Sequence, residues 1–399
     1  MIERTLQPHL LALAGRYPVI TLTGPRQSGK TTLCRLAFPD RPYVSLEAPA
    51  TRELATEDPL GFLASYPGGA VLDEIQRTPQ LPSYLQGLVD ADPRPGRFIL
   101  TGSQNLALIN AVTQSLAGRT ALVELLPLGL DEVRRFPHPP SGLYPTLWTG
   151  GYPRILEQDL PAAEWLANYT ATYVERDVRQ VLNVGNLVQF QTFLRLCAGR
   201  TGQLLNLSSL AADCGLSTAT ARSWLSVLEA SYLLFRLPPL HSNLGKRLVK
   251  APKLYFYDTG LVCSLLGIEE PQQLETHPLR GAIFETWVVA EITKQHLHRG
   301  QRPRLYFYGE RGRLEIDLIV ERGANLTAIE IKSAQTPAAS FFANLEQLER
   351  RVAASDAPVR LAKRMVIYGG GESQQRRLGQ LLAWSDVPAQ DWVSQRPAS

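Results

Sequence analysis

The chain has few cysteines and no long run of hydrophobic residues. Its 399 residues include only four cysteines, which are far apart and show no Cys-x-x-Cys spacing. Neither a zinc ribbon nor a disulfide framework is therefore indicated. No apolar run approaches the roughly 20 residues that cross a membrane, and the start of the chain lacks the charged-then-apolar pattern of a signal peptide. We expect a cytoplasmic protein without a membrane partner.

The chain also has little excess charge. It contains 41 Lys and Arg against 37 Asp and Glu, a formal net charge of +4. A net charge this small is compatible with a nucleic-acid partner but does not indicate one, so an argument for DNA depends on local patches. The length is sufficient for two or three domains, each with its own core.

One segment carries a complete nucleotide-binding pattern. The apolar run 19–22 leads into Gly-x-x-x-x-Gly-Lys-Thr, and residues 31–37 have a helical pattern. In this context backbone N–H groups and the helix N-terminus bind a polyphosphate, Lys30 reaches the β- and γ-phosphates, and Thr31 ligates Mg²⁺. The pattern predicts binding of ATP or GTP through Gly24, Pro25, Arg26, Gln27, Ser28, Gly29, Lys30, Thr31 and Thr32.

A second apolar run, residues 69–72, ends in the acids Asp73 and Glu74. In ATPases with a phosphate loop, an acid at the carboxyl end of a strand holds the Mg²⁺ shell, and a neighbouring Glu polarises the attacking water. We assign Asp73 to the metal and Glu74 to the water. An exposed acidic pair at a strand end is the simpler alternative.

Residues 97–102 predict a third buried strand, parallel to the others. In ring-forming ATPases this strand lies between the two nucleotide strands, and its polar end contacts the γ-phosphate or the water. Ser103 is the first candidate for that sensor and Asn105 the second, with a turn cap as the alternative. Arg119 either caps a helix or senses nucleotide, in this subunit or as an arginine finger on a neighbour. Arg154 is the other candidate for the finger.

Residues 187–260 change character. Helical patterns over 188–198, 207–217 and 218–230, with Ser217 able to cap the last, precede strand patterns at 232–237 and 253–257. This is the order of elements in a winged helix, and the candidate contacts to DNA phosphates are Arg222, Lys246, Arg247 and Lys250. A packing or dimerisation module is the alternative.

The last third of the chain predicts a helix followed by a β-hairpin. The helix covers residues 281–292, strand patterns follow at 304–308, 314–320 and 326–332, and residues 322–325 form the turn between the last two. Period-two alternation puts Glu330 and Lys332 on one face, where Asp317 on the partner strand can face them. Two carboxylates and a lysine suit an Mg²⁺ site.

The spacing of Asp317, Glu330 and Lys332, with Glu285 on the preceding helix, resembles the PD-(D/E)xK nuclease superfamily. The resemblance implies a second metal site at Asp317 and Glu330, assisted by Glu285 and Lys332. Members of that superfamily also include inactive DNA-binding modules, so cleavage stays open, and an exposed cross-strand pair is the alternative.

Nearly the whole chain resembles a group of bacterial and archaeal AAA+ ATPases, the archaeal-type ATPases, whose C-terminal domain has long lacked an assigned function. The matching motifs are residues 23–32, Leu72-Asp73-Glu74-Ile75-Gln76, Leu100-Thr101-Gly102-Ser103-Gln104, Ala117-Gly118-Arg119, Tyr257-Asp258-Thr259-Gly260-Leu261 and Glu330-Ile331-Lys332. The resemblance implies ATP as the nucleotide, with Mg²⁺, and self-association, as a hexameric ring.

We therefore expect an α/β protein of several domains. The expected order is an AAA+ ATPase core with a parallel sheet (1–155), a helical lid (156–186), a winged helix (187–260), a PD-(D/E)xK nuclease-like domain (261–370) and a C-terminal tail (371–399). Three functions remain in view: an ATP-driven motor that binds and remodels branched or duplex DNA, as helicases and branch-migration enzymes do; an ATP-gated metal-dependent endonuclease; and a nucleotide switch that binds a protein partner.

Overall fold

The computed structural model has two compact units and describes residues 2–103, 114–174, 187–240, 249–310, 314–355 and 357–393. The first unit consists of Met1–Leu128, Val227–Leu233 and Leu297–Gln301, and the second consists of Gly129–Ser226, Leu234–His296 and Arg302–Ser399. The first unit therefore differs from the expected continuous core over residues 1–155, because it ends earlier and includes two short segments from much later in the sequence.

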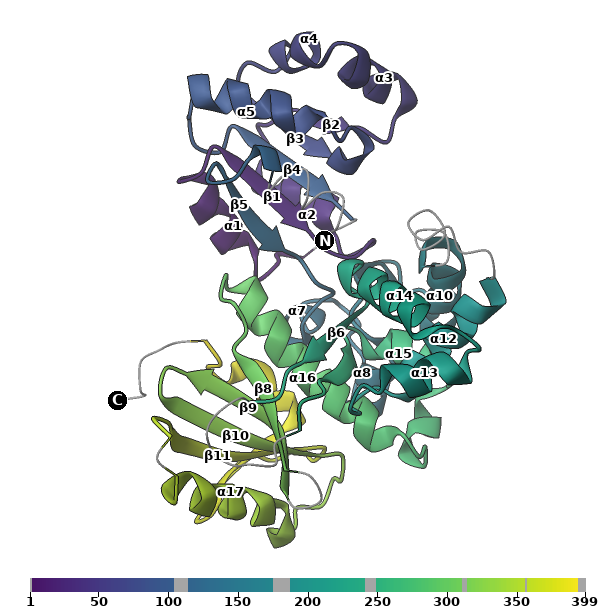
Figure 1. The fold of residues 1–399 in the computed structure, drawn as a ribbon, viewed down its shortest axis with the longest axis vertical. Coiled ribbons are helices and arrows are strands. Elements are labelled where there is room, and N and C mark those ends of the chain that lie inside the picture. Colours follow the sequence, from purple (N-terminus) through teal and green to yellow (C-terminus); the bar gives the residue numbers. More distant parts are fainter. Residues whose placement is uncertain are drawn as a thin grey trace. The chain divides into compact units, whose positions relative to one another are not determined.

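A five-stranded parallel sheet forms the first unit (Figure 1). Its strands in spatial order are β2 (Tyr43–Ser45), β3 (Ala70–Asp73), β4 (Phe98–Gly102), β1 (Val19–Thr23) and β5 (Thr120–Glu124), and every neighbouring pair is parallel. The predicted place of β4 between β1 and β3 is confirmed. Since parallel strands present their carboxyl ends at one edge, the residues that follow β1, β3 and β4 come together there.

The described helices of this unit include two, α3 (Pro49–Glu57) and α4 (Pro59–Ala64), that are divided by a sharp break. Its other described helices are α1 (Gln7–Ala14), α2 (Lys30–Ala37) and α5 (Leu81–Ala91), with the 3₁₀ turn η1 (Ile75–Arg77). The helices α3 and α4 are separated by the single residue Asp58. Asp58 leaves the helical conformation and its carboxylate accepts a hydrogen bond from Gly61 N at 2.9 Å, so that Pro59 starts a new helix.

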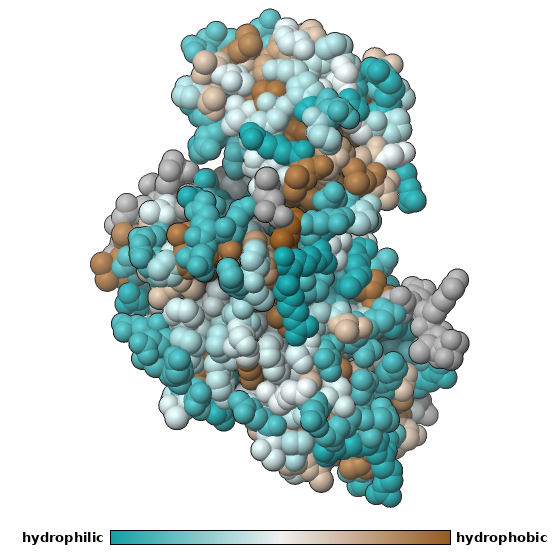
Figure 2. Space-filling model, turned by 180° about the vertical axis from the view of Figure 1, so that it is seen from behind, coloured by the Kyte–Doolittle hydropathy of each residue, from teal (hydrophilic) through white to brown (hydrophobic). Residues whose placement is uncertain are grey.

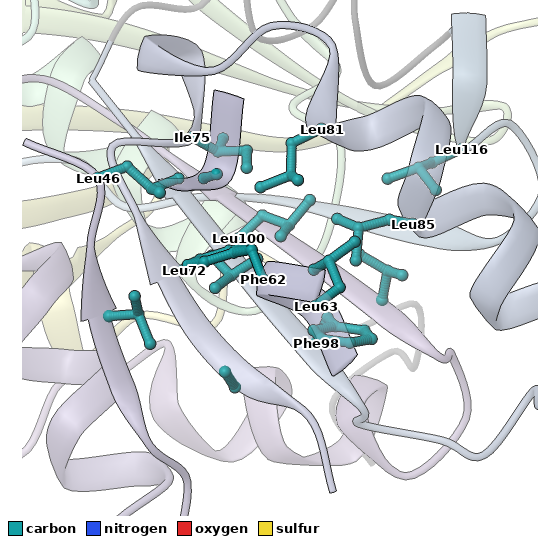
Figure 3. Close-up of a cluster of buried hydrophobic side chains, with 14 of the residues drawn as sticks. Leu46, Phe62, Leu63, Leu72, Ile75, Leu81, Leu85, Phe98, Leu100 and Leu116 are labelled. Atoms are coloured by element: carbon teal, nitrogen blue, oxygen red, sulfur yellow. The ribbon is translucent and has the colours of Figure 1, made fainter. Parts of the chain in front are cut away.

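Buried hydrophobic side chains fix the strands that carry the polar residues. Figure 3 shows the cluster in which Leu72 of β3 and Leu100 of β4 pack with Phe62 of α4 and Leu85 of α5. Each of these side chains is at most 1% exposed, and full burial of such a side chain is worth about 1.5–3 kcal/mol. This packing holds β3 and β4 in register, and with them the residues at their carboxyl ends.

Most of the described helices lie wholly or largely in the second unit. They are α7 (Leu130–Val133), α8 (Leu143–Thr149), α9 (Pro153–Glu157), α10 (Ala162–Tyr169), α12 (Leu187–Gly199), α13 (Leu207–Asp213), α14 (Thr218–Ala230), α15 (Thr259–Leu265), α16 (Arg280–His298) and α17 (Ala343–Ala353). Within the expected helical lid (156–186), α10 is followed by a π-helical turn, Thr170–Val174, and residues 175–186 lie outside the described residues.

The three helices and two strands predicted between residues 188 and 257 are confirmed as secondary structure. Helices α12, α13 and α14 precede β6 (Leu234–Leu237) and β7 (Lys253–Phe256), which pair antiparallel. The predicted cap is also confirmed, because Ser217 Oγ accepts a hydrogen bond from Thr220 N at 3.0 Å at the start of α14.

The Tyr257-Asp258-Thr259-Gly260-Leu261 motif is a packing element. The buried Asp258 carboxylate accepts hydrogen bonds from Leu261 N at 2.9 Å, which caps α15, and from Gly151 N at 2.7 Å. Gly260 packs so closely on the end of α8 that a Cβ atom there would lie 2.8 Å from the carbonyl oxygen of Thr149. The motif thereby joins α15 to the turn after α8.

The second sheet has six strands. In spatial order they are β12 (Gln374–Arg376), β13 (Gly379–Ala383), β11 (Arg360–Tyr368), β10 (Asn325–Lys332), β9 (Leu314–Arg322) and β8 (Leu305–Glu310). The predicted β9–β10 hairpin is confirmed, with Asn325 opposite Arg322. The residues from 371 onward were expected to form a separate tail. In the structure β12 and β13 belong to the sheet instead, and Leu381 and Ala383 lie in its core.

The face shown in Figure 2 is mostly hydrophilic, with scattered hydrophobic side chains. The most exposed large hydrophobic residues of the described chain include Leu54, Leu60 and Val188, at 51%, 58% and 69%. Among the described residues, every helix is too short or too polar to span a bilayer.

Candidate functional site

The loop between β1 and α2 has the backbone conformation of a phosphate loop. Gly24, Gln27 and Gly29 have positive φ angles of 148°, 62° and 92°. A Cβ atom at Gly24 would lie 2.1 Å from the carbonyl oxygen of Leu125, so only glycine fits between the loop and the end of β5. The helix α2 begins at Lys30, and its N-terminal amides therefore face the loop.

Lys30 is buried inside this loop. Its Nζ donates hydrogen bonds to the carbonyl oxygens of Gly24 at 2.9 Å and Pro25 at 2.7 Å. Burial lowers the pKa of Lys30 to about 8, an effect that the nearby Glu74 and Asp73 carboxylates oppose. Ser28 Oγ is buried without a hydrogen-bond partner among the described residues. An ammonium group and an unpaired hydroxyl within a ring of amides suit an incoming polyphosphate.

The Asp73 carboxylate accepts hydrogen bonds from hydroxyl groups on three different elements. The donors are Thr31 of α2 at 2.9 Å, Tyr43 of β2 and Thr101 of β4. Mg²⁺ takes oxygen ligands and commonly keeps one or two protein ligands beside substrate phosphates and water. Thr31 and Asp73 are the residues that would hold it, and the metal would neutralise charge on the phosphates.

Glu74 lies beside Asp73 in a left-handed conformation, with φ 59°. Its carboxylate accepts hydrogen bonds from Ser103 Oγ at 3.3 Å and from the Gln76 amide, and burial raises its pKa. The Gln76 Oε1 atom is buried without a partner among the described residues. Ser103, the first candidate for the sensor, thus lies beside the acid Glu74, whereas Gln76 received no role from the sequence. The second sensor candidate, Asn105, lies outside the described residues.

Two further residues support the loop, and sequence reasoning missed both. Arg4 is 5% exposed and donates hydrogen bonds to the carbonyl oxygens of Ser28 at 2.6 Å and Leu126 at 2.9 Å. The Tyr232 hydroxyl lies 2.7 Å from Thr23 Oγ1 at the end of β1. Both contacts join residues distant in sequence, so no local pattern indicates them.

Arg119 is not brought to the nucleotide loop of its own chain. It immediately precedes β5, and Val19 at the start of β1 pairs with Thr120, so Arg119 lies at the amino edge of the sheet and the loop lies at the carboxyl edge. Its guanidinium forms two hydrogen bonds with Asp90, at 2.5 and 2.8 Å. Arg154, on α9 of the second unit, donates to Gln158 Oε1 at 3.2 Å.

A second group of polar residues gathers at the end of the β9–β10 hairpin. The two strands pair as far as Ile329 opposite Leu318, and beyond that point the Asp317 carboxylate accepts a hydrogen bond from Ile331 N at 2.8 Å. Lys332 Nζ contacts Glu330 and lies 3.7 Å from Asp317. The structure therefore brings together Asp317, Glu330 and Lys332 as the hairpin pattern predicts.

Burial and mutual repulsion shape this carboxylate group. Glu330 is 1% exposed, and burial followed by the Asp317 charge raises its pKa to about 7. Asn344 Nδ2 of α17 also donates to Glu330 at 3.3 Å. Because Glu330 is buried, the alternative of an exposed cross-strand pair is wrong.

Glu285 of α16 has a different set of partners from the one expected. Lys253 Nζ and Tyr255 OH of β7 lie 2.9 and 2.5 Å from its Oε1. Lys253 Nζ also lies 2.6 Å from Glu315. Burial followed by the Asp317 charge raises the pKa of Glu285 to about 7. Among the described residues, no set of three or more His, Cys, Asp or Glu side chains is arranged to hold a metal ion.

The candidate DNA contacts are only partly described. Arg222 lies on the exposed face of α14, and Lys250 is exposed ahead of β7. Lys246 and Arg247 lie outside the described residues.

The phosphate loop after β1, together with the acids at the end of β3, defines a P-loop ATPase domain. Residues 16–134 match the family described as an AAA domain. Two regions that follow match families described as domains of unknown function: residues 142–272 match DUF8612 and residues 280–386 match DUF4143.

Two uncharacterized mycobacterial proteins are similar to the chain along most of its length. They are Mb2031c of Mycobacterium bovis and Rv2008c of Mycobacterium tuberculosis, each 34% identical over 365 residues, covering 89% of this chain and 77% of the relative. The chain belongs to the same family as these two proteins.

Solved structures are less similar. A Walker-type ATPase of Pyrococcus abyssi aligns with 65% of this chain and 94% of its own, at 15% identity and a TM-score of 0.42. A variant of RuvB of Thermotoga maritima aligns with 58% of this chain and 87% of its own, at 19% identity and a TM-score of 0.32. Because these scores are low, the family assignment depends on the sequence relatives.

Proposed function

We propose that this protein hydrolyses ATP and couples the hydrolysis to binding and remodelling of DNA, with branched or duplex DNA as the substrate. The observation that carries the ATPase assignment is the meeting of Lys30, Thr31, Asp73 and Glu74 at one edge of the sheet. Lys30 binds the β- and γ-phosphates, and Glu74, oriented by Ser103, polarises the attacking water.

The DNA part of the proposal rests on the second unit. The elements α12, α13, α14, β6 and β7 have the order of a winged helix, and α14 would be the helix that enters the groove. Arg222 and Lys250 are exposed cations that suit phosphates.

The proposal also includes self-association into a hexameric ring, in which an arginine of a neighbouring copy completes the ATP site. Light scattering with and without ATP measures the size of the assembly.

The test is steady-state ATP hydrolysis with Mg²⁺, alone and with single-stranded, duplex or four-way-junction DNA, while the same DNA is run on a gel. Stimulation by one DNA form, with its strands intact but rearranged, is the expected result. Lys30→Ala abolishes turnover in every lane. Arg222→Ala loses the stimulation and keeps basal turnover, whereas Arg195→Ala, an exposed arginine of α12, keeps both. Turnover that ignores every DNA form contradicts the motor and favours a nucleotide switch that binds a protein partner.

The second candidate function is an ATP-gated, metal-dependent endonuclease. The observation that favours it is the position of Asp317, Glu330 and Lys332 at the point where β9 and β10 separate. Two carboxylates with a lysine can hold a divalent cation and activate water. Nicking of DNA that requires Mg²⁺ or Mn²⁺ and disappears in Asp317→Ala supports this candidate. DNA that stays intact with either metal contradicts it.

A further inference from the structure

Tyr232 has a strained backbone at the turn between α14 and β6. Its φ is 57°, and its side chain is 3% exposed. A bulky residue rarely adopts this left-handed conformation, which costs on the order of 1–3 kcal/mol. Such a conformation persists only where surrounding contacts hold it, so the contacts of Tyr232 identify what holds the turn.

The Tyr232 hydroxyl reaches the ends of two strands beneath the phosphate loop. It lies 2.7 Å from Oγ1 of Thr23, the last residue of β1, and 3.3 Å from Oε1 of Glu124, the last residue of β5. All three residues belong to the first unit. A single hydroxyl therefore links the end of β1, where the phosphate loop starts, to the end of the neighbouring strand β5.

Thr23 immediately precedes Gly24 of the phosphate loop, and Gly24 in turn contacts Lys30. The next residue, Gly24, is fixed against the carbonyl of Leu125, and its own carbonyl accepts the hydrogen bond from Lys30 at 2.9 Å. A displacement of Thr23 must therefore shift Gly24 and the partner of Lys30. On its other side, Tyr232 is two residues beyond Ala230, the last residue of α14; residues 227–230 of that helix belong to the first unit, and its start, with Arg222, belongs to the second.

We propose that Tyr232 is a positioning residue that ties the segment Val227–Leu233 to the phosphate loop, so that nucleotide occupancy and the conformation of this segment change together. The strained turn is the element with two states: it keeps its positive φ while the hydroxyl is held at Thr23, and relaxes when the loop rearranges. The proposal rests on nucleotide binding in the proposed function and does not require DNA.

The test compares Tyr232→Phe, Thr23→Val and the double variant with the unmodified protein. Removing the shared hydrogen bond lowers kcat/KM for ATP by roughly five- to tenfold. The loss in the double variant is expected to be smaller than the sum of the two single losses, because both single variants remove the shared hydrogen bond, although Tyr232→Phe also removes the contact with Glu124 and Thr23→Val the one with Val123 O. Thr23→Ser keeps the hydroxyl and restores the activity. ATP also changes hydrogen exchange at the amides of residues 227–233 in the unmodified protein, and this response is absent in Tyr232→Phe.

A matched control lies two residues earlier on the same strand. Thr21 Oγ1 lies 3.0 Å from Thr120 Oγ1, a hydroxyl pair between β1 and β5 that has no link to the loop. Thr21→Val is expected to lose stability while keeping the ATP-dependent exchange of residues 227–233. If the unmodified protein hydrolyses ATP and Tyr232→Phe matches it in kcat/KM and exchange, the inference is overturned alone. If the unmodified protein binds no nucleotide, both the inference and the proposed function are overturned.

Discussion

Ser103 Oγ donates a hydrogen bond to Glu74 Oε2 across 3.3 Å, from the end of β4 to the end of β3. The Gln76 amide donates to the same carboxylate oxygen. Glu74 is thus held by two neutral donors, and its second oxygen is left for other contacts. An acid held in this way can orient a water molecule and accept a proton from it.

Replacing this acid tests its role. Glu74→Gln keeps the shape of the side chain and removes the charge, so we expect turnover to fall about 10²- to 10⁴-fold while ATP still binds. Steady-state hydrolysis and the binding of a fluorescent ATP analogue measure the two effects. Glu53→Gln, at an exposed acid of α3, serves as the control and keeps turnover. Undiminished hydrolysis in Glu74→Gln would mean that another group activates the water.

Arg119→Ala separates a structural arginine from an arginine finger. Because Arg119 forms an exposed ion pair with Asp90 at the amino edge of the sheet, its loss is expected to change the midpoint of urea denaturation very little and to leave turnover unchanged. A finger role requires a loss on the order of 10³- to 10⁵-fold. Urea denaturation and ATP hydrolysis at several protein concentrations distinguish the two, since a finger in a neighbouring subunit acts only in the assembly.

Glu291 predicts a pH dependence of stability. Its buried carboxylate accepts a hydrogen bond from Leu130 N at 2.9 Å, and burial raises its pKa from 4.5 to about 7. The folded protein therefore holds this proton more tightly than the unfolded chain, so the contribution of Glu291 to stability falls as the pH rises from 4.5 to about 7.

Glu291→Gln removes this dependence. The unfolding free energy of the variant, relative to the unmodified protein, is expected to rise across that interval with a slope below about 1.4 kcal/mol per pH unit, the limit for one proton. Urea denaturation between pH 5 and pH 8 measures it, and Glu275→Gln, at an exposed position, is the control. A difference that stays constant with pH would show that Glu291 does not titrate in this range.

Gly260→Ala tests the packing of the motif around Asp258. An added Cβ would lie 2.8 Å from Thr149 O and 2.9 Å from Gly150 N, both backbone atoms, so we expect a loss of about 1–3 kcal/mol. At Gly281 in α16 the nearest atom outside the helix is 4.0 Å away, and Gly281→Ala is expected to be neutral or stabilising by up to about 1 kcal/mol. Thermal unfolding of both variants checks the contrast; equal midpoints would contradict it.

The parts of the site that the sequence predicts are those encoded locally. The phosphate loop needs glycines at fixed spacing after a strand, and Asp73 and Glu74 follow an apolar run, so a short segment contains each signal. The β9–β10 hairpin is equally local, because its turn and its alternation lie within 20 residues or so. The order of β4 between β1 and β3 was predictable only through the family resemblance.

The remaining features depend on contacts over long sequence distances. Arg4 supports Leu126, Tyr232 contacts Thr23, and Lys253 pairs with Glu285; none of these pairs leaves a periodic signal. Arg119 is a different case, since a residue that precedes a parallel strand lies at the opposite edge from one that follows it. The position of Arg119 ahead of the strand could therefore have been inferred from the sequence, but the Gly-Arg pattern was given more weight.

The return of residues 227–233 and 297–301 to the first unit has a consequence for synthesis on the ribosome. His298 Nε2 accepts the hydrogen bond from Leu126 N at 3.1 Å, as Tyr232 contacts Thr23. When residue 128 has been made, neither partner exists, and at about 5–20 residues per second the chain needs roughly 10–35 s to reach residue 301. The nascent sheet must wait that long for its last native contacts, a period in which its unfinished edge depends on chaperones or on rapid completion of the chain.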